Sequence, residues 1–546
     1  MQPLIAPLYG GKSAYELLGA MVQQQPIRGD YEIVRDFWRG QNFWPDFEIS
    51  WRQALHDGFI QGSGAPPKQV KLKADLLESL PRGGEPASGG ITVEPAVGSQ
   101  SAKQETAFPQ VSPRSFKVLS GDIEVNFRPD PNLWDGRFAN NGWLQECPKP
   151  VSKLCWDNAI LISPALAQSG NLTTGDVVEL SLGGRSLRGP VWVMPGQAPN
   201  AVTLHLGYGR SRVGRVGAGV GFDAYALRTS AALWFERGGK IVPTGQTHLL
   251  VTTQAHHQLG SPDREVYRSG TLNQYLANSS FVKSSVEIPN MDETLYYPDE
   301  YQYAGYKWGM SIDLTTCIGC NACLVACEAE NNIPVVGKDQ VHRNREMFWI
   351  RVDTYFKGPL DNPEFDHMPV PCMQCEHAPC ELVCPVEATV HDSEGLNLQV
   401  YQRCVGTRFC SNNCPYKVRR FNFLRYSPYD KPWREPMYNP EVTVRWRGVM
   451  EKCTYCIQRI SAARITAEKE NRRIRESELR TACQQACPAE AIVFGDLNDP
   501  DSKVARLKAH PLDYSMLGQL NTRPRTTYLA KLQNPGPQTD QGLGGA

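Results

Sequence analysis

Fifteen of the 17 cysteines lie between Cys317 and Cys487, and they fall into four groups, three of which end in Cys-Pro. The groups are Cys317, Cys320, Cys323 and Cys327; Cys372, Cys375, Cys380 and Cys384; Cys404, Cys410 and Cys414; and Cys453, Cys456, Cys483 and Cys487. Thiolates three residues apart can wrap one iron–sulfur cube, because a short turn directs their sulfurs inward, and the fourth cysteine of such a run binds the other cluster of a pair. The four groups therefore predict two pairs of clusters, an arrangement suited to moving single electrons.

The third group is one cysteine short. Thr407 stands three residues after Cys404, where the spacing predicts a cysteine. A corner iron without its thiolate is labile, so we expect a [3Fe–4S] cluster here, with a higher reduction potential than an all-cysteine cube. The alternative is that the Thr407 oxygen or a water molecule holds a fourth iron.

Other uses of cysteine explain the pattern less well. Structural zinc closes with four ligands from two Cys-x-x-Cys pairs, which accounts neither for groups of four nor for the repeated Cys-Pro. A disulfide framework is a poor match, and no Cys-x-x-Cys-His is present, so we expect no covalently attached haem. Cys147 and Cys155 lie outside the groups. They could pair in an oxidising compartment, but two buried free thiols are the favoured interpretation.

The secondary structure around these cysteines is predicted from the order of apolar and polar residues. A strand over residues 307–313 leads into the first group, and residues 347–356 alternate as a second strand. Two basic runs flank the third and fourth groups, and we expect them to offset the negative charge of thiolate-bound clusters. They are Lys417, Arg419 and Arg420, and Arg445, Arg447 and Lys452.

The whole chain is predicted to have an α+β fold in six regions. Residues 13–25 and 31–37 have helical apolar spacing, so residues 1–62 form a helical piece, too small to bury its own core. Residues 63–113, rich in Gly, Pro, Ser and Ala, predict a linker. Short β-rich stretches over 114–260 predict a β-barrel-like domain. A connector (261–305), the cysteine-rich domain (306–500) and an irregular tail (501–546) complete the chain.

The composition of the chain gives no support for several classes of function. Lys and Arg together number 57, as do Asp and Glu, and this balance gives no support for nucleic-acid binding. No run of 18 apolar residues is present, so we expect no membrane-spanning segment. The first residues have neither a basic nor an apolar region of signal-peptide type, and we expect no signal. Hydrolytic Ser-His sets and carboxylate pairs do not emerge, so no catalytic residue is predicted.

Residues 306–500, through all four cysteine groups, resemble the four-cluster ferredoxin subunit of molybdopterin oxidoreductases. The resemblance implies a double ferredoxin-like domain in which the first group pairs with the fourth and the second with the third. Three [4Fe–4S] clusters and one [3Fe–4S] cluster would follow. The implied ligand sets are Cys317, Cys320, Cys323 and Cys487; Cys327, Cys453, Cys456 and Cys483; Cys372, Cys375, Cys380 and Cys414; and Cys384, Cys404 and Cys410 with Thr407 at the vacant position.

Residues 114–260 resemble the C-terminal β-domain of molybdopterin catalytic subunits, through residues 161–167, 175–180 and 204–209. A domain of this type fused to four cysteine groups looks like the large iron–sulfur subunit of alternative complex III, as do residues 3–12, 404–415 and 447–456. That complex oxidises quinol and reduces a cytochrome or an oxidase. The chain resembles only the C-terminal half of that subunit, which implies that the other half and the export signal belong to a separate chain.

The resemblance implies an electron-transfer subunit of a membrane-bound quinol-oxidising complex, not itself catalytic. Its partners would be an integral membrane subunit that binds quinol near the [3Fe–4S] cluster, a multihaem cytochrome c and the separate N-terminal molybdopterin-like half. The chain would be peripheral, on the periplasmic side, and would hold no molybdenum cofactor. Two alternatives stay open: the iron–sulfur subunit of a true molybdopterin reductase, and a docking scaffold whose clusters are mainly structural.

Overall fold

The computed structural model describes residues 12–23, 29–42, 44–57, 60, 116–259, 266–283, 289–290, 303–427 and 432–534. The chain divides into two units, residues 1–107 and 108–546. The predicted linker over 63–113 lies outside the described residues, as does the segment 3–12 apart from its last residue.

The described part of the first unit consists of the helices α1 (Ala14–Gln23), α2 (Asp30–Gly40) and α3 (Phe47–Asp57). The predicted helices over 13–25 and 31–37 correspond to α1 and α2. Trp51 in α3 is 5% exposed, stacks on Phe47 and donates a hydrogen bond from its indole to the Tyr31 hydroxyl. No residue of α2 is buried.

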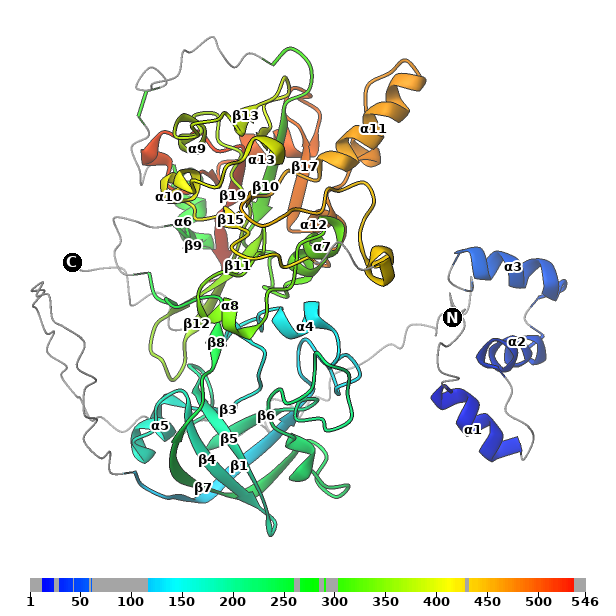
Figure 1. Ribbon diagram of the computed structural model, residues 1–546, viewed down its shortest axis with the longest axis vertical. Coiled ribbons are helices and arrows are strands. Elements are labelled where there is room, and N and C mark those ends of the chain that lie inside the picture. The colour runs from blue at the N-terminus through cyan, green and yellow to red at the C-terminus, as the bar shows by residue number, and fades with distance from the viewer. Residues whose placement is uncertain are drawn as a thin grey trace, which may run out of the picture. The chain divides into compact units, whose positions relative to one another are not determined.

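Six strands of the second unit close a barrel, at the lower end of the unit in Figure 1. In order around the barrel they are β1 (Leu119–Arg128), β6 (Ala201–His205), β3 (Ile160–Ile162), β5 (Arg185–Val193), β4 (Asp176–Leu182) and β7 (Phe235–Thr247). Alternate residues of β4 are buried, as a strand with one face on a core requires. Gly183 and Gly184, both at positive φ, form the two-residue turn between β4 and β5. The predicted β-barrel is confirmed.

The barrel connects to the cysteine-rich part through residues 142–157. This segment contains α4 (Gly142–Glu146) and β2 (Leu154–Cys155), and β2 pairs with β8 (Val251–Thr252). The Glu146 carboxylate accepts hydrogen bonds from the Val336 and Gly337 amides, at 3.0 and 2.7 Å. Helix α5 (Pro164–Gly170) is capped by the Ser163 hydroxyl and packs on the barrel. In Figure 1, α4 and β8 lie between the barrel and the cysteine-bearing loops.

A four-stranded sheet supports the cysteine-rich part, in the order β17 (Ile492–Asp496), β10 (Trp308–Asp313), β19 (Thr526–Leu529) and β18 (Asp513–Tyr514). The predicted strand over 307–313 is β10. The prediction of an irregular tail after residue 501 is wrong, because α13 (Lys503–Ala509), β18, β19 and β20 (Lys531–Gln533) lie there. β19 pairs in parallel with β10, and Thr526 and Tyr528 are fully buried. Strands of two to four residues are too short for a clear alternation of apolar and polar residues.

The described part of the connector contains regular secondary structure. β9 (Ser269–Thr271) pairs in parallel with β20, and α6 (Leu272–Ala277) follows it, with a capping box between Thr271 and Gln274. The last strand of the chain therefore lies beside a strand that precedes the cysteine-rich domain.

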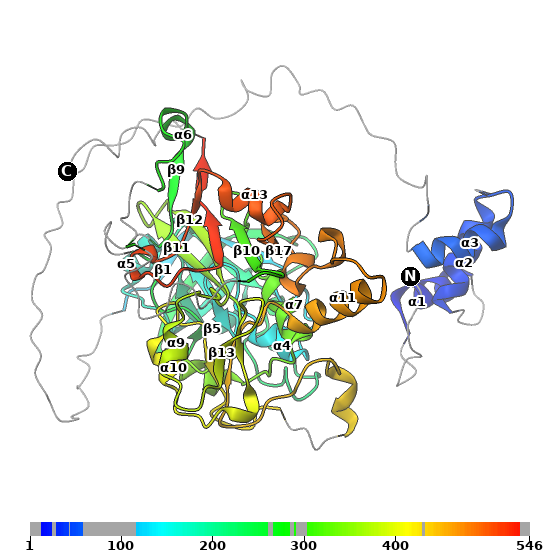
Figure 2. The same ribbon diagram turned by 90° about the horizontal axis from the view of Figure 1, so that it is seen from above.

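Short hairpins and helices carry the cysteines. The strand pairs are β11 (Arg351–Lys357) with β12 (Glu364–Val370), β13 (Thr389–His391) with β14 (Asn397–Gln399), and β15 (Arg420–Phe421) with β16 (Met450–Glu451). The helices are α7 (Ala322–Glu330), α8 (Lys338–His342), α9 (Pro379–Leu382), α10 (Phe409–Asn413), α11 (Ile457–Lys469) and α12 (Ala482–Gln485). The second predicted strand begins at Arg351 rather than Met347, since residues 347–350 are buried without strand pairing. Helix α7 packs beside α12 (Figure 1), and α10 packs beside α9 (Figure 2).

Short 3-10 helices complete the fold: η1 (Ala224–Ala226), η3 (Tyr401–Arg403), η4 (Pro432–Met437), η5 (Glu476–Glu478) and η6 (Gly518–Leu520). Among the described residues, no helix combines the length and apolar character that crossing a membrane needs.

Candidate iron–sulfur sites

Site 1 brings together Cys317, Cys320, Cys323 and Cys487, from the loop before α7, from α7 itself and from the end of α12. Burial raises the pKa of Cys323, and the thiols of Cys483, Cys317, Cys320 and Cys487 raise it further. Cys323 is buried, Cys317 and Cys487 are half-buried, and Cys320 is exposed. Site 1 therefore opens to the surface.

Site 2 brings together Cys327, Cys453, Cys456 and Cys483, all of them buried. Burial raises the pKa of Cys327, and the other three thiols raise it further. The Asn331 amide donates to the Cys327 sulfur at 3.4 Å. Hydrogen bonds to sulfur are one of the means by which a protein sets the reduction potential of an iron–sulfur cluster.

Site 3 brings together Cys372, Cys375, Cys380 and Cys414, which are also all buried. Burial raises the pKa of Cys375, and the other three thiols raise it further. The guanidinium of Arg419 donates to the Cys380 sulfur at 3.1 Å.

Site 4 brings together Cys384, Cys404 and Cys410, all of them half-buried. Burial raises the pKa of Cys410; the Arg419 guanidinium lowers it, and the thiols of Cys404 and Cys384 raise it. Thr407 is exposed on the loop between Cys404 and α10. The assignment of the 15 cysteines to four ligand sets stays a prediction, in which the set that contains Thr407 has three thiols.

Consecutive sites are neighbours, in the order 1, 2, 3 and 4. Among the charged neighbours of Cys323 in site 1 is Cys483 of site 2, and among those of Cys453 in site 2 is Cys372 of site 3. Arg419 lies between sites 3 and 4, since it affects the thiols of both Cys380 and Cys410. The two middle sites are buried and the two end sites are partly exposed.

The thiol groups of the four sites are suited to binding iron. Burial and the Cys372 thiol raise the pKa of Cys453 to about 12. A buried thiolate needs positive charge beside it, which bound metal supplies. In the described part of the chain, no group of three or more His, Cys, Asp or Glu has the spacing for a single metal ion. The four thiolates of a cube bind four different irons, so their sulfurs stand further apart.

Three of the six flanking basic residues are buried among these sites. They are Arg419, at 6% exposed, Arg445, at 5%, and Lys452, at 0%. Lys452 donates to the carbonyl oxygens of Asn397 and Cys453, and Arg445 pairs with Glu451 at 2.9 Å. The expectation that basic residues lie close to the sulfurs is therefore met by Arg419, Arg445 and Lys452, whereas Lys417 and Arg447 are exposed.

A further buried cation, Lys153, was not predicted. It comes from the segment that joins the barrel to the cysteine-rich part, more than a hundred residues before the first cysteine group, and it is 0% exposed. Cys317 and Cys323 are among its charged neighbours. No pattern in the sequence pairs residues so far apart. Cys147 and Cys155, from the same segment, are buried and free, as favoured from the sequence.

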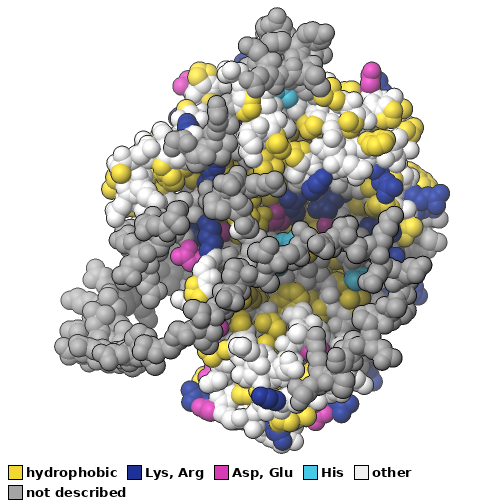
Figure 3. Space-filling model, turned by 90° about the vertical axis from the view of Figure 1, so that its left-hand side faces the viewer, with side chains coloured by type: hydrophobic (Ala, Val, Ile, Leu, Met, Phe, Trp, Pro, Cys, Tyr) yellow, Lys and Arg dark blue, Asp and Glu magenta, His cyan; other side chains and the backbone are white. Residues whose placement is uncertain are grey.

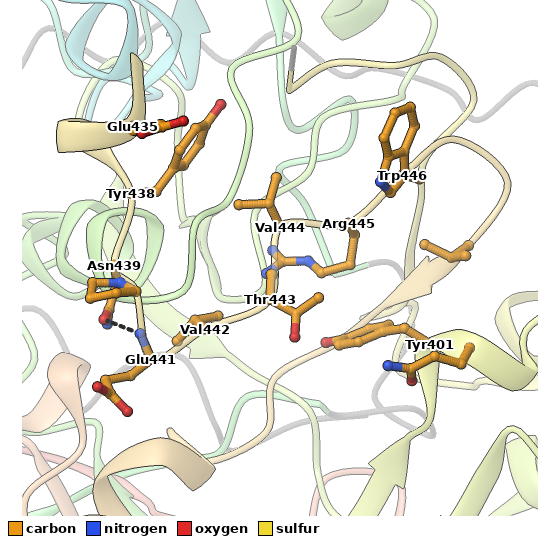
Figure 4. Close-up of a pocket in the computed structure, with 13 residues that line it drawn as sticks. Tyr401, Glu435, Tyr438, Asn439, Glu441, Val442, Thr443, Val444, Arg445 and Trp446 are labelled. Carbon is orange, nitrogen blue, oxygen red and sulfur yellow. Dashed lines mark hydrogen bonds between the residues drawn. The ribbon is translucent and has the colours of Figure 1, made fainter. Parts of the chain in front are cut away.

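Two cavities flank site 4. A cavity of about 710 Å³ is lined by residues 401–402, 435, 438–446 and 449, and Tyr401 lies three residues before Cys404. Figure 4 shows the Arg445 side chain in the middle of this lining, between Val444 and Tyr401, with Trp446 and Tyr438 at opposite ends. A second cavity of about 340 Å³ is lined by Thr407 itself and by four arginines: Arg345, Arg408, Arg419 and Arg420.

The surface near the sites is mixed in character. Figure 3 shows Lys and Arg side chains next to apolar ones across the middle of one face, and neither kind covers its visible described part. Close to the end sites, Ile318, Leu382, Val405 and Phe409 are 62%, 55%, 65% and 59% exposed.

Comparisons with known proteins agree with this geometry. Two family models, each described as a 4Fe-4S dicluster domain, match the chain at residues 316–388 and 363–427. The iron–sulfur cluster-binding subunit of menaquinone reductase from Nitratidesulfovibrio vulgaris is 41% identical over 233 residues, which cover 89% of that protein and 41% of this chain.

Two further relatives are more distant. Iron–sulfur subunit 1 of the Hdr-like menaquinol oxidoreductase from Archaeoglobus fulgidus is 32% identical over 247 residues, 84% of its length and 41% of this chain. A polysulfide reductase subunit from Wolinella succinogenes is 30% identical over 223 residues, 92% of its length and 40% of this chain. The chain belongs to the family of iron–sulfur cluster-binding subunits that includes the menaquinone reductase subunit, and it carries additional sequence for which these relatives have no counterpart.

Proposed function

We propose that the chain is the iron–sulfur electron-transfer subunit of a membrane-bound quinol-oxidising complex of the alternative complex III kind. It would pass electrons from quinol toward a multihaem cytochrome c. The protein would contribute ligation, spacing and control of reduction potential, and the bound clusters would supply one-electron chemistry.

The observation that carries the proposal is the burial of the cysteines: those of sites 2 and 3 are buried, whereas sites 1 and 4 are partly exposed. Buried sites exclude water from the middle of the series of sites. Partly exposed sites at the two ends are accessible to redox partners. A scaffold with purely structural clusters would need neither a series of neighbouring sites nor two exposed ends.

The proposed cofactors are three [4Fe–4S] clusters, at sites 1 to 3, and one [3Fe–4S] cluster at site 4. Thr407 is the residue that supports the second type, since its side chain has no thiol. The same proposal assigns the chain no molybdenum cofactor and no haem.

The proposed partners follow from the barrel and from site 4. The barrel supports a relation to the C-terminal β-domain of molybdopterin catalytic subunits, here without cofactor. A separate chain that resembles the N-terminal half of such a subunit is a proposed partner. Exposed Val405 and Phe409 beside site 4 favour an integral membrane subunit as the neighbour there. The chain would be peripheral, on the periplasmic side of the membrane.

The names of two relatives support quinone as the redox partner, because one is a menaquinone reductase subunit and the other a menaquinol oxidoreductase subunit. A second candidate function is the iron–sulfur subunit of a molybdopterin-dependent reductase. The polysulfide reductase relative favours it, since 92% of that protein aligns with this chain.

The test is reduction of the clusters by quinol in the purified membrane complex, followed by EPR. We expect quinol to reduce the site 4 cluster, and the complex to contain no molybdenum. Clusters that stay oxidised with quinol present would contradict the proposal, and stoichiometric molybdenum in the complex would favour the reductase.

A further inference from the structure

Lys153 belongs to the segment of residues 142–157, which joins the barrel to the cysteine-rich part, and its side chain lies near site 1. The residue is completely buried, and its ammonium group donates to the Pro150 carbonyl at 2.6 Å. Burial lowers the pKa of Lys153 to about 8, while Asp353, Cys147 and the two proposed site 1 ligands Cys317 and Cys323 favour its charged form.

A continuous series of contacts ties Lys153 to the site 1 loop. The Pro150 carbonyl that accepts from Lys153 also accepts from the Thr354 hydroxyl, at 3.0 Å. That hydroxyl lies 3.0 Å from the ring nitrogen Nδ1 of His367. The His367 ring lies so close to Gly319, between Cys317 and Cys320, that a Cβ there would approach it to 2.4 Å.

A second contact fixes the same segment against the loop. The side-chain amide of Asn321, next to Cys320, donates to the Pro148 carbonyl at 2.6 Å. The segment that carries Lys153 is therefore held on both sides of the site 1 loop, and the position of the ammonium group is set by the fold.

We propose that Lys153 is a positioning residue that raises the reduction potential of the cluster at site 1. The proposal rests on the ligand set assigned to that site. A fixed positive charge stabilises the reduced cluster, which carries one more negative charge than the oxidised one. The matches to the 4Fe-4S dicluster domains begin at residue 316, so the barrel and its joining segment lie outside them. The fused barrel would thus adjust the potential of a cluster that it does not ligate.

The experiment uses the full chain in its purified complex, with an EPR-monitored redox titration of every cluster. In Lys153→Met, we expect the potential of one cluster to fall by about 59 mV, a tenfold change in a one-electron equilibrium. Lys153→Gln keeps a donor for Pro150 without the charge and should shift the same cluster. Lys153→Arg keeps the charge and should leave all potentials close to those of the unchanged protein.

Lys508→Met is the matched control. Lys508 donates to the carbonyls of Met310 and Arg525 and to the Thr527 hydroxyl, and its charged neighbours include no cysteine. This variant should leave every potential unchanged.

Each outcome decides the proposal. Unchanged potentials in both neutral variants would overturn it. If the neutral variants lose the site 1 cluster while Lys153→Arg keeps it, the charge is needed to hold the cluster rather than to set its potential, and the proposal is overturned. Loss of that cluster in all three variants would show a purely packing role and overturn it. The iron content of the unchanged chain tests the proposed clusters separately, so their failure is distinguishable from a failure of Lys153.

Discussion

Two loops of the cysteine-rich domain have nearly the same backbone but different ligands. One is Cys-Ile-Gly-Cys-Asn, residues 317–321, and the other is Cys-Val-Gly-Thr-Arg, residues 404–408. Their central glycines, Gly319 and Gly406, have φ values of 67° and 77°. The apolar residues before those glycines are 62% and 65% exposed.

The last residues of the two loops also correspond. Asn321 and Arg408 have φ values of 63° and 64°, and each precedes the first turn of a helix. Cys320 of the first loop corresponds to Thr407 of the second, and both are exposed. Thr407 therefore stands in a loop shaped for a cysteine, and the fold has not adjusted to the missing thiol. The comparison indicates that a partly exposed end site tolerates one ligand fewer.

The largest loss of iron is expected when a cysteine is removed from a buried middle site, which should not tolerate one ligand fewer. Cys483→Ala should remove the site 2 cluster, because water cannot readily replace a ligand whose surroundings are dry. Iron content should fall by about four atoms per chain or more. Cys155→Ala, at a buried thiol outside the sites, should keep all the iron and cost about 1 kcal/mol of stability. Equal iron loss in both variants would mean that Cys483 is not a ligand.

Thr407→Cys should make the second loop chemically equal to the first. We expect one additional iron per chain and loss of the oxidised-state EPR signal of site 4, because a fourth thiolate completes a cube. Thr407→Ser, which adds no thiol, should leave both iron content and signal unchanged. A [3Fe–4S] signal that persists in Thr407→Cys would mean that the loop does not direct residue 407 at the cluster.

The loop backbone itself can be tested at Gly406. A Cβ there would lie 2.6 Å from the Gly448 carbonyl oxygen, and the residue is at positive φ. Gly406→Ala should cost about 2 to 3 kcal/mol in thermal or denaturant unfolding. Gly448→Ala has positive φ but nothing within 4 Å of its Cβ, so it should cost only about 1 kcal/mol. Equal costs would show that the close approach is unimportant.

The smallest losses of stability are expected from substitutions at the last residues of the two loops, Asn321 and Arg408. Asn321→Ala removes the buried hydrogen bond to the Pro148 carbonyl and should cost about 1 to 2 kcal/mol. Arg408→Ala removes an exposed guanidinium that lies 5.4 Å from the centre of the Phe421 ring and 5.2 Å from that of Phe423, and should cost about 0.5 kcal/mol. If unfolding measurements show a larger cost for Arg408→Ala than for Asn321→Ala, Asn321 does not hold the segment of Pro148 against the site 1 loop.

The sequence predicted the parts of the molecule that depend on local pattern. The cysteine groups, the strand before them and the barrel were visible because spacing and alternation act over a few residues. The short strands near the C-terminus were missed, since β19 is formed by pairing with β10, more than 200 residues earlier. Lys153 was missed for the same reason, because its neighbours Cys317 and Cys323 are brought close only by the fold.

The most direct test of the account is the iron content of the purified chain together with its EPR spectrum as isolated. The account predicts about 15 irons per chain and an oxidised-state signal from a [3Fe–4S] cluster, while the oxidised [4Fe–4S] clusters stay silent. About 16 irons with no oxidised-state signal would contradict it, because Thr407 or water would then complete a cube and the two loops would hold clusters of the same type.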